Sequence, residues 1–205
     1  TSPKFQPYAD TFSARYVFFG PSIRPTNEVF EKTREKLVYI SMGTVNNDMT
    51  VFYKNCIDAL KDSDYQVVLS VGSQVDIKLL EEYVTKSKSK AQFHVFPYVN
   101  QIAVLEKADA FITHCGMNSV SEALYFKVPL VMYPQTNEQK GVAFRVNELG
   151  AGMYLSGDSI SDIQMAFKEL LKRPEYKEQA TVISNSFSKC GGSKAAAEKI
   201  LDICS

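Results

Sequence analysis

Gly116 stands between the apolar run 110–113 and a helical pattern that begins near residue 117. The first N–H groups of a helix have no partner within it, and the helix dipole places about half a positive charge at that end, so a phosphate group suits this position. Gly116 allows the backbone to approach a ligand closely, and Asn118 and Ser119 add side chains that can bond to phosphate oxygens. This junction therefore predicts an anion site.

Glu122 follows Asn118 and Ser119 by one helical turn. Residues three and four apart share a helix face, about 5 Å apart along the axis. A carboxylate there could accept hydrogen bonds from both hydroxyls of a ribose attached to the phosphate. An ordinary capped helix with a surface glutamate would give the same pattern, so this short motif leaves both interpretations open.

The composition is that of a globular protein, with 45% hydrophobic and 22% charged residues among 205. One domain with a short appendage is expected at this length. Lys and Arg total 23 and equal Asp and Glu at 23, which gives no general field to attract nucleic acid or an anionic membrane. The four cysteines lack C-x-x-C spacing, which argues against zinc and favours a reduced, cytoplasmic setting. No apolar run reaches about 18 residues, so no membrane span is expected.

Apolar runs of strand length alternate with segments of helical period along most of the chain. These runs are 37–40, 67–69, 93–96, 110–113, 130–133 and 153–155. Near-continuous apolar strands joined by helical crossovers form parallel sheets covered on both faces. The sequence therefore predicts an α/β fold with a doubly wound parallel sheet of about six strands.

The two ends of the chain depart from this alternation. Segment 1–23 contains two prolines and no crossover helix, so we interpret it as a linker. Beyond residue 159 the pattern is wholly helical, and Pro174 marks a helix start. Gly191-Gly192 then separates a last helix, 194–203, whose apolar positions need a surface to cover. The predicted parts are 1–23, 24–190 and 191–205.

Ligands of parallel α/β sheets bind outside the carboxyl ends of the strands. Loops rich in polar residues or glycine follow four predicted strands, at 41–44, 98–101, 114–119 and 134–139. We expect these loops to converge on one edge. Asp62-Ser63-Asp64 has the spacing of an Asp-x-Asp metal site, but it follows a helix and precedes a strand. It is therefore predicted to be a solvated turn at the other edge, and no metal site is predicted.

Other chemistries fit the sequence less well. His114 and Cys115 are adjacent, and neighbours on a strand point to opposite faces, so a thiol–imidazole pair for hydrolysis is not expected. Gly-x-Ser-x-Gly and Walker loops are missing, which argues against an α/β-hydrolase or a P-loop NTPase. Gly-x-Gly-x-x-Gly is missing too, which makes a nicotinamide dehydrogenase less favoured.

The residues around Gly116 resemble the donor-binding signature of the UDP-glycosyltransferases, most of all the bacterial macrolide-type members. The similar residues are Phe111 to Ser119, Glu122-Ala123-Leu124, Val128-Pro129, Pro134 and Glu138-Gln139, extended by Gln101, Val104-Leu105, Arg145-Val146 and Glu148-Leu149-Gly150. The resemblance implies one Rossmann-like half of a two-domain GT-B enzyme, the C-terminal donor-binding half. Segment 1–23 would then be the interdomain linker, 24–190 the nucleotide-sugar-binding domain and 191–205 a C-terminal helix.

The resemblance also implies a role for each site residue. The uracil would lie against Tyr98, with the Val99 backbone reading its edge and Gln101 near the nucleoside, and Glu122 would hold the ribose hydroxyls. The diphosphate would be surrounded by Ser41, Gly43, His114, Gly116, Asn118 and Ser119, with Thr44 in the same UDP-sugar site. Glu138 and Gln139 would bond to the sugar hydroxyls.

Four positions differ from the usual signature. Tyr98 replaces tryptophan, so stacking should survive but weaken, because a phenol presents less area than an indole. Asn100 replaces proline, Glu138 replaces aspartate and Lys127 replaces glycine. The donor sugar is therefore open, with UDP-glucose favoured.

The implied reaction is an inverting, metal-independent displacement at the anomeric carbon, with UDP leaving and no cofactor besides the UDP-sugar co-substrate. The catalytic base of the relatives is a histidine of the N-terminal, acceptor-binding half, and this chain offers no candidate for it. The chain alone is therefore expected to bind UDP-sugar and to transfer little. A natural donor subunit of a split GlcNAc transferase, half of a nucleotide-sugar epimerase and a non-catalytic nucleotide sensor remain alternatives.

Overall fold

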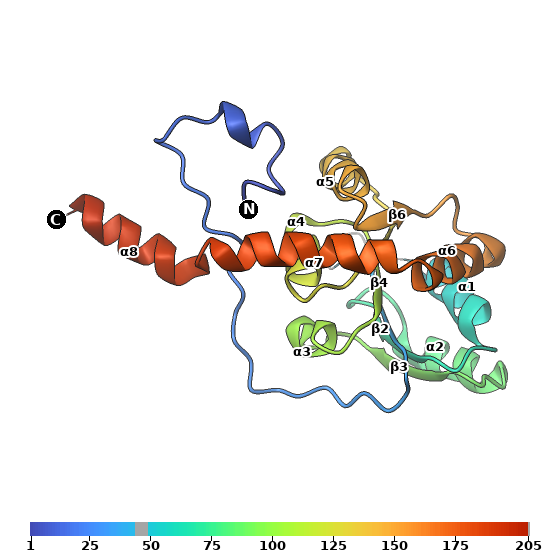
Figure 1. Ribbon diagram of the computed structural model, residues 1–205. Coiled ribbons are helices and arrows are strands. Elements are labelled where there is room, and N and C mark those ends of the chain that lie inside the picture. Colours follow the sequence, from blue (N-terminus) through green and yellow to red (C-terminus); the bar gives the residue numbers. More distant parts are fainter. Residues whose placement is uncertain (44–48, 205) are drawn as a thin grey trace.

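The computed structural model describes residues 1–43 and 49–204 (Figure 1). Its strands are β1 (Leu37–Ser41), β2 (Gln66–Ser70), β3 (Gln92–Phe96), β4 (Ala110–Thr113), β5 (Leu130–Met132) and β6 (Gly152–Tyr154). Its helices are α1 (Thr50–Leu60), α2 (Ile77–Lys86), α3 (Gln101–Leu105), α4 (Met117–Tyr125), α5 (Asn137–Glu148), α6 (Ile160–Lys172), α7 (Pro174–Lys189) and α8 (Gly192–Cys204), and a short 3-10 turn spans Ala9–Thr11.

The strands form one sheet in the order β3-β2-β1-β4-β5-β6, and every neighbouring pair is parallel. The predicted doubly wound parallel sheet is therefore confirmed. Chain direction across the sheet reverses between β1 and β4, and such a reversal opens a crevice at the carboxyl ends of the strands. The register aligns Ser41 with both Ser70 and Thr113, so the ends of β1, β2 and β4 lie level at this crevice.

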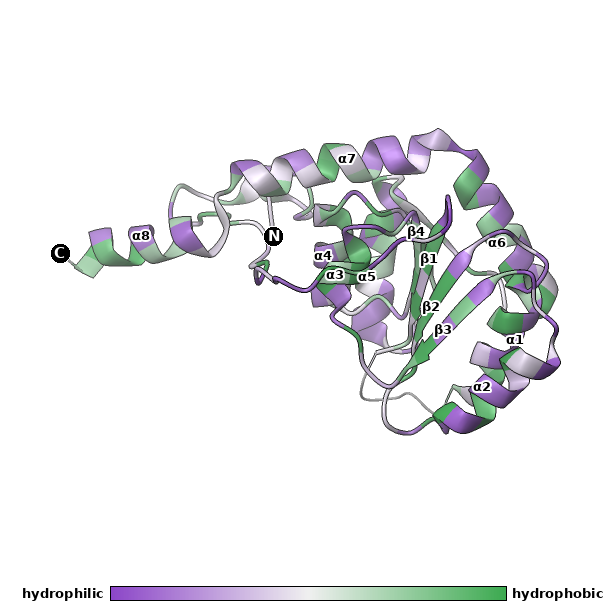
Figure 2. Cartoon of the chain, turned by 90° about the horizontal axis from the view of Figure 1, so that it is seen from below, coloured by the Kyte–Doolittle hydropathy of each residue, from purple (hydrophilic) through white to green (hydrophobic). Residues whose placement is uncertain are grey.

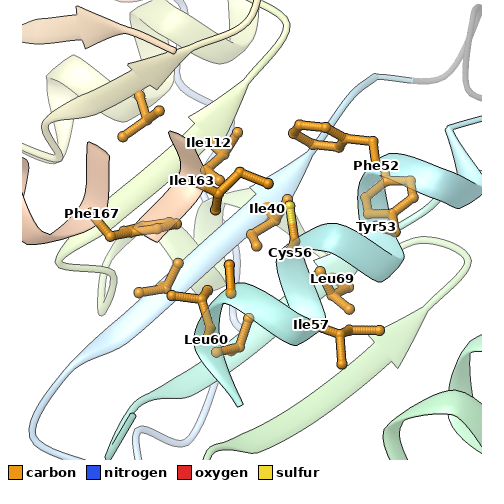
Figure 3. Close-up of a cluster of buried hydrophobic side chains, with 14 of the residues drawn as sticks. Ile40, Phe52, Tyr53, Cys56, Ile57, Leu60, Leu69, Ile112, Ile163 and Phe167 are labelled. Atoms are coloured by element: carbon orange, nitrogen blue, oxygen red, sulfur yellow. The ribbon is translucent and has the colours of Figure 1, made fainter. Parts of the chain in front are cut away.

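Helices cover both faces of the sheet (Figure 2). Successive residues of β1 serve opposite faces: Val38 and Ile40 belong to the cluster beneath α1, α2 and α6, whereas Leu37 and Tyr39 belong to the cluster beneath α3, α4, α5 and α7. Figure 3 shows the first cluster, with Ile40 facing the side chains of α1 and α6. Each central strand is buried on both faces, which explains why its sequence is continuously apolar.

The α6–α7 region follows the predicted pattern. Ile163, Phe167 and Leu170 are buried on α6, and Ala180, Ile183 and Phe187 are buried on α7. Pro174 occupies the first turn of α7, as predicted, where its missing N–H costs no hydrogen bond.

The two ends of the chain lie outside the sheet. Phe5 is buried against Phe187 of α7, with ring centroids 5.8 Å apart, and residues 24–36 form an extended segment that leads into β1. Helix α8 has no buried residue and projects beyond α7 (Figure 1). Its apolar positions, which were predicted to need a surface to cover, are not covered by the described residues: Ile200, Leu201 and Ile203 are all exposed. Within the described residues, no helix combines the length and the apolar character needed to cross a bilayer.

Candidate functional site

A pocket of about 800 Å³ opens at the carboxyl edge of the sheet, above β1 and β4. Every predicted site residue in the described part of the chain lines it: Ser41, Gly43, Tyr98, Val99, Gln101, His114, Gly116, Asn118, Ser119, Glu122, Glu138 and Gln139. Thr44 lies outside the described residues. The four loops predicted to converge do so, while their roles toward a ligand remain predictions.

The floor of the pocket is held by a buried tyrosine of α1. The Tyr53 hydroxyl accepts a hydrogen bond from Met42 N at 3.1 Å and donates one to Ser70 O at 3.2 Å. Burial raises the pKa of this phenol, so it stays protonated and keeps its proton for Ser70. One side chain therefore fixes the loops that leave β1 and β2.

The His114 ring fits between two glycines. A Cβ atom at Gly43 would come within 2.8 Å of ring atoms Cε1 and Nε2, and one at Gly116 would come within 2.8 Å of Nε2. Gly43 also has a φ of +85°, which disfavours other residues. Gly116 has an ordinary φ of −61°, so its lack of a side chain matters because it leaves room for the imidazole. From the sequence, glycine was predicted at this position for the close approach of a ligand, and the room it leaves for the imidazole is a second reason that only the structure shows.

His114 is neutral in the free protein at pH 7. Burial lowers the pKa of its imidazole, and neither the Ser41 backbone nor the charge of Glu138 offsets this effect. Its Nδ1 atom is buried without a hydrogen-bond partner among the described residues. Burying a polar atom without a hydrogen bond costs folding free energy. A ligand that bonded to Nδ1 would remove this cost.

Cys115 turns away from the pocket for a reason other than the predicted one. Strand β4 ends at Thr113, so His114 and Cys115 do not alternate along a strand. Cys115 instead has a φ of 67°, and its thiol is fully buried, 3.7 Å from Thr113 O. Burial raises the pKa of this thiol to about 12, so it carries no thiolate for nucleophilic chemistry.

Helix α4 presents its start to the pocket. Gly116 is the N-cap and supplies no side-chain cap, so the N–H groups of the first turn are left to solvent or ligand. Met117, Asn118 and Ser119 of this turn line the pocket. The positive end of the helix dipole thus faces the cavity together with amides that are not hydrogen-bonded to other described residues, and binding of an anion there stays a prediction.

A hydrogen-bond chain connects the α4 start with α3. Gln101 Nε2 donates to Glu122 Oε2 at 2.5 Å and to Ser119 Oγ at 3.3 Å, while the Tyr39 hydroxyl donates to Gln101 Oε1 at 3.3 Å. Tyr39 is buried and stacks on Phe111, with ring centroids 4.6 Å apart, and burial raises the pKa of its phenol to about 12. Tyr39 therefore fixes which end of the Gln101 amide faces Glu122.

Tyr98 and Val99 lie in the loop between β3 and α3. The Tyr98 side chain is 56% exposed and lines the pocket, so its ring is accessible for stacking. Asn100 begins α3 as its N-cap, and its side chain accepts from Ala103 N. Asn100, which stands where the family signature usually has proline, thus has a structural role in starting the helix.

The start of α5 forms the opposite wall. Thr136 and Gln139 make a capping box, in which Gln139 Oε1 accepts from Gln135 N at 2.7 Å and from Thr136 N at 3.1 Å. The Nε2 group of Gln139 makes no hydrogen bond to the described residues and is left to donate to a ligand. Glu138 is exposed in the same turn and free to face a ligand as an acceptor.

Six further residues line the pocket. Met42, Met117, Gln135 and Thr136 lie in the loops that were predicted to converge but were given no role, whereas Tyr39 and Ser70 lie outside every predicted loop. Ser70 directly follows the predicted strand 67–69, so the rule about strand ends could have found it. Tyr39 lies in the middle of β1, and no signal in the sequence marks which mid-strand side chain reaches the crevice.

Two other candidates lie away from the pocket. Asp62-Ser63-Asp64 connects α1 with β2 at the amino ends of the strands, and Asp64 pairs with Lys90 at 2.8 Å. His94 lies within β3, where its ring stacks on Phe96 and its Nε2 lies 3.4 Å from Gln66 Nε2. Neither residue set lines the carboxyl-edge pocket.

A parallel sheet in this strand order, with a pocket at its reversal point, defines a Rossmann-like domain. Residues 25–188 match the family model described as UDP-glucoronosyl and UDP-glucosyl transferase, and the chain therefore belongs to this family. A Bacillus subtilis protein named "Uncharacterized UDP-glucosyltransferase YojK" is 39% identical over 209 residues, covering 98% of this chain and 50% of that protein. The Bacillus subtilis "NDP-glycosyltransferase YjiC" is also 39% identical, over 96% of this chain and 50% of its own length.

Solved glycosyltransferases share the fold. The calicheamicin glycosyltransferase CalG4 superposes with a TM-score of 0.87 at 28% identity, over 98% of this chain and 50% of that one. The glycosyltransferase of kitacinnamycin superposes with a TM-score of 0.86 at 29% identity, over 98% of this chain and 53% of that one. The fold is thus one Rossmann-like half of a GT-B glycosyltransferase, and the chain spans about half the length of the curated relatives it matches.

Proposed function

We propose that this chain is the C-terminal, donor-binding domain of an inverting glycosyltransferase that uses a UDP-sugar, with UDP-glucose as the first candidate. Family membership and relatives named UDP-glucosyltransferase support the donor class. The observation that carries the proposal is the pocket itself, in which a carboxylate and amide pair, Glu122 and Gln101, lies beside an uncapped helix start.

The nucleoside half of the ligand fits the α3 side of the pocket. Tyr98 offers an accessible ring on which a uracil can stack. The Glu122 carboxylate, held by the Gln101 amide, can accept hydrogen bonds from ribose hydroxyls. A ribose in contact with Glu122 would place its phosphates one helical turn away, at the start of α4.

The diphosphate half fits the α4 start. The first-turn N–H groups, the Ser119 hydroxyl and the backbone at Gly116 can donate to phosphate oxygens. As the glycosidic bond to the phosphate breaks, negative charge grows on the departing UDP, and fixed donors and the helix dipole stabilise it without reorganising. A nearby diphosphate would also raise the pKa of His114, so this imidazole could gain a proton on binding. We therefore propose a metal-independent departure of UDP.

The sugar would lie toward α5. Gln139 Nε2 remains free to donate to a hydroxyl, because the capping box occupies only Oε1. Glu138 can accept from a neighbouring hydroxyl. These two side chains would select the donor sugar.

The base and the acceptor site belong to the proposed N-terminal, acceptor-binding domain. His94 is held within β3 by Phe96 and Gln66, and His114 is buried beside the proposed diphosphate, so neither is placed to deprotonate an acceptor. We expect the isolated chain to bind UDP and UDP-glucose and to transfer sugar negligibly. Appreciable transfer to an acceptor by the purified chain would contradict this part of the proposal.

Calorimetric titration with UDP, GDP and TDP tests the proposal directly. UDP should bind most tightly, and a UDP concentration of 100 times the dissociation constant should stabilise the fold by about 2.7 kcal/mol. Glu122→Ala should weaken UDP binding about tenfold, since hydrogen bonds to a charged group contribute about 1.5–3 kcal/mol. Glu81→Ala, on the exposed face of α2, is the matched control and should bind like the parent. No binding of UDP, or equal binding by both variants, would refute the proposed site.

A further inference from the structure

Among the described residues, the loop that carries Tyr98 and Val99 is hydrogen-bonded near its ends, and Val99 packs against the core cluster beneath α3 and α4. Pro97 O accepts a hydrogen bond from Gly72 N at 2.9 Å, and Asn100 Oδ1 accepts from Ala103 N at 3.3 Å. Tyr98 itself is more than half exposed, so packing does little to orient its ring. The direction in which this ring faces the pocket therefore depends on how firmly the loop backbone is held.

Asn100 makes a second contact, to a distant part of the chain. Its Nδ2 donates to Thr26 Oγ1 at 2.7 Å. The φ of Asn100 is −65°, a value that most residues adopt, so the backbone at this position does not require asparagine. What the asparagine adds is a side chain that caps α3 with its oxygen and binds Thr26 with its nitrogen.

Thr26 belongs to the extended segment 24–36, which runs along the outside of the domain before it enters β1 (Figure 1). This segment is anchored to the sheet near its other end. Lys32 Nζ lies 2.6 Å from Asp109 Oδ2, Thr33 Oγ1 donates to Gln92 Oε1 at 2.6 Å, and Thr33 N donates to Gln66 Oε1 at 2.8 Å. We call segment 24–36 the strap. The contact between Thr26 and Asn100 therefore joins the Tyr98 loop to a strap that is itself held by the sheet.

We propose that Asn100 is a positioning residue for nucleoside binding, acting through Thr26. The strap segment 24–36 holds Asn100, the N-cap of α3. Because Asn100 directly follows Tyr98 and Val99, the fixed N-cap keeps their backbone in the orientation that receives the base. The proposal rests on the proposed function, because it assumes that this loop binds the nucleoside. It assigns to the strap a role in donor affinity in addition to its role as a connection.

Substitution of the two strap threonines separates this role from general stability. Thr26→Val removes the acceptor for Asn100. Thr33→Val is the matched control, since it removes a hydroxyl from the remote end of the same strap but leaves that end held by the Thr33 N–Gln66 and Lys32–Asp109 contacts. Thr26→Ser keeps the hydroxyl. Asn100→Ser keeps a cap for Ala103 N but cannot bridge to Thr26, and it provides a second variant if Thr26→Val folds poorly.

Calorimetry with UMP, UDP and pyrophosphate gives the readout. Thr26→Val and Asn100→Ser should each weaken the binding of UMP and of UDP by the same factor, about fivefold, as expected for the loss of one net hydrogen bond. Both should leave pyrophosphate binding unchanged. Thr33→Val and Thr26→Ser should bind all three like the parent.

Three results would overturn the proposal. If Thr26→Val and Asn100→Ser both bind UMP and UDP like the parent, the strap does not position the loop, while the proposed function stands. If pyrophosphate weakens by the same factor as UMP, the substitutions disturb the whole pocket and the role is merely structural. If the parent chain binds neither nucleotide, the proposed function fails together with this inference.

Discussion

The two edges of the sheet carry similar polar residues and use them differently. At the amino edge, Asp109 accepts from Leu37 N at 2.9 Å and from Lys32 at 2.6 Å, and Asp64 pairs with Lys90. At the carboxyl edge, Glu122 is bonded to the neutral amide of Gln101, and the buried His114 Nδ1 has no hydrogen-bond partner within residues 1–43 and 49–204.

Under the proposed function, this difference separates residues that hold the fold from residues that bind a ligand. Charges at the amino edge are matched within the chain, so their removal should change stability and leave binding alone. The groups at the carboxyl edge are incompletely matched, although burying a polar group without a partner is costly. Their arrangement is explained when a ligand supplies the missing partners.

The largest effect is expected from Gly116→Ala. The new Cβ would lie 2.8 Å from His114 Nε2, so the imidazole or the start of α4 must move. UDP affinity should fall about 30-fold, as donors to the diphosphate are displaced. Gly141→Ala is the control, because a Cβ there meets no atom within 4 Å. This control should keep its affinity and gain about 0.5–1 kcal/mol of stability, since alanine favours a helix over glycine. Equal affinities of the two variants, measured by calorimetry, would contradict the expected contrast.

Asp109→Ala tests the amino edge. Its carboxylate holds both Leu37 N at the start of β1 and the ammonium group of Lys32, so its loss should lower the free energy of unfolding by about 2 kcal/mol. The dissociation constant for UDP should stay within error of the parent value. Urea unfolding and calorimetry on the same preparation measure both quantities. A large loss of affinity in the folded variant would mean that the two edges are not independent.

Tyr39→Phe should have a smaller effect, confined to binding. The substitution keeps the stacking on Phe111 and removes the hydroxyl that orients the Gln101 amide. UDP affinity should fall about threefold, because one neutral hydrogen bond is lost. The loss should disappear when Gln101 is already alanine, which a double-mutant cycle measures. Additive losses would show that Tyr39 acts independently of Gln101.

Asp64→Ala should have the smallest effect. Both side chains of its ion pair with Lys90 are exposed, so the free energy of unfolding should change by less than about 0.5 kcal/mol. UDP binding should be unchanged, and Mn²⁺ should shift the melting temperature of the parent and the variant equally. A Mn²⁺ stabilisation that depends on Asp64 would revive the Asp-x-Asp interpretation.

Much of the fold could be predicted from the sequence because a strand buried on both faces is a continuous apolar run. The run 110–113 coincides with β4, and each of the other predicted runs differs from its strand by one residue at one or both ends. Strand ends are less certain because polar residues such as Gln66 and Ser70 still pair in the ladder. Helix α8 shows the opposite case, since an apolar pattern indicates that a helix can bury a face but not where its partner lies.

The site was predictable where it follows from topology. Loops after parallel strands meet at one edge, so Ser41, Gln101, Ser119 and Glu138 could be grouped before their geometry was known. The direction of individual side chains could not be predicted, as Cys115 shows. Its left-handed backbone follows from the turn between β4 and α4, and the alternation argument assumed a strand that had already ended.

The sequence by itself determined the alternation of elements, the parallel sheet and the family, because these depend on local periodicity and on residue types in order. Only the tertiary structure decided that His114 fits between Gly43 and Gly116, that Tyr39 sets the Gln101 amide, and that Thr26 reaches Asn100. These contacts join residues that are distant along the chain, and their geometry depends on how helices and strands pack, which no local pattern encodes.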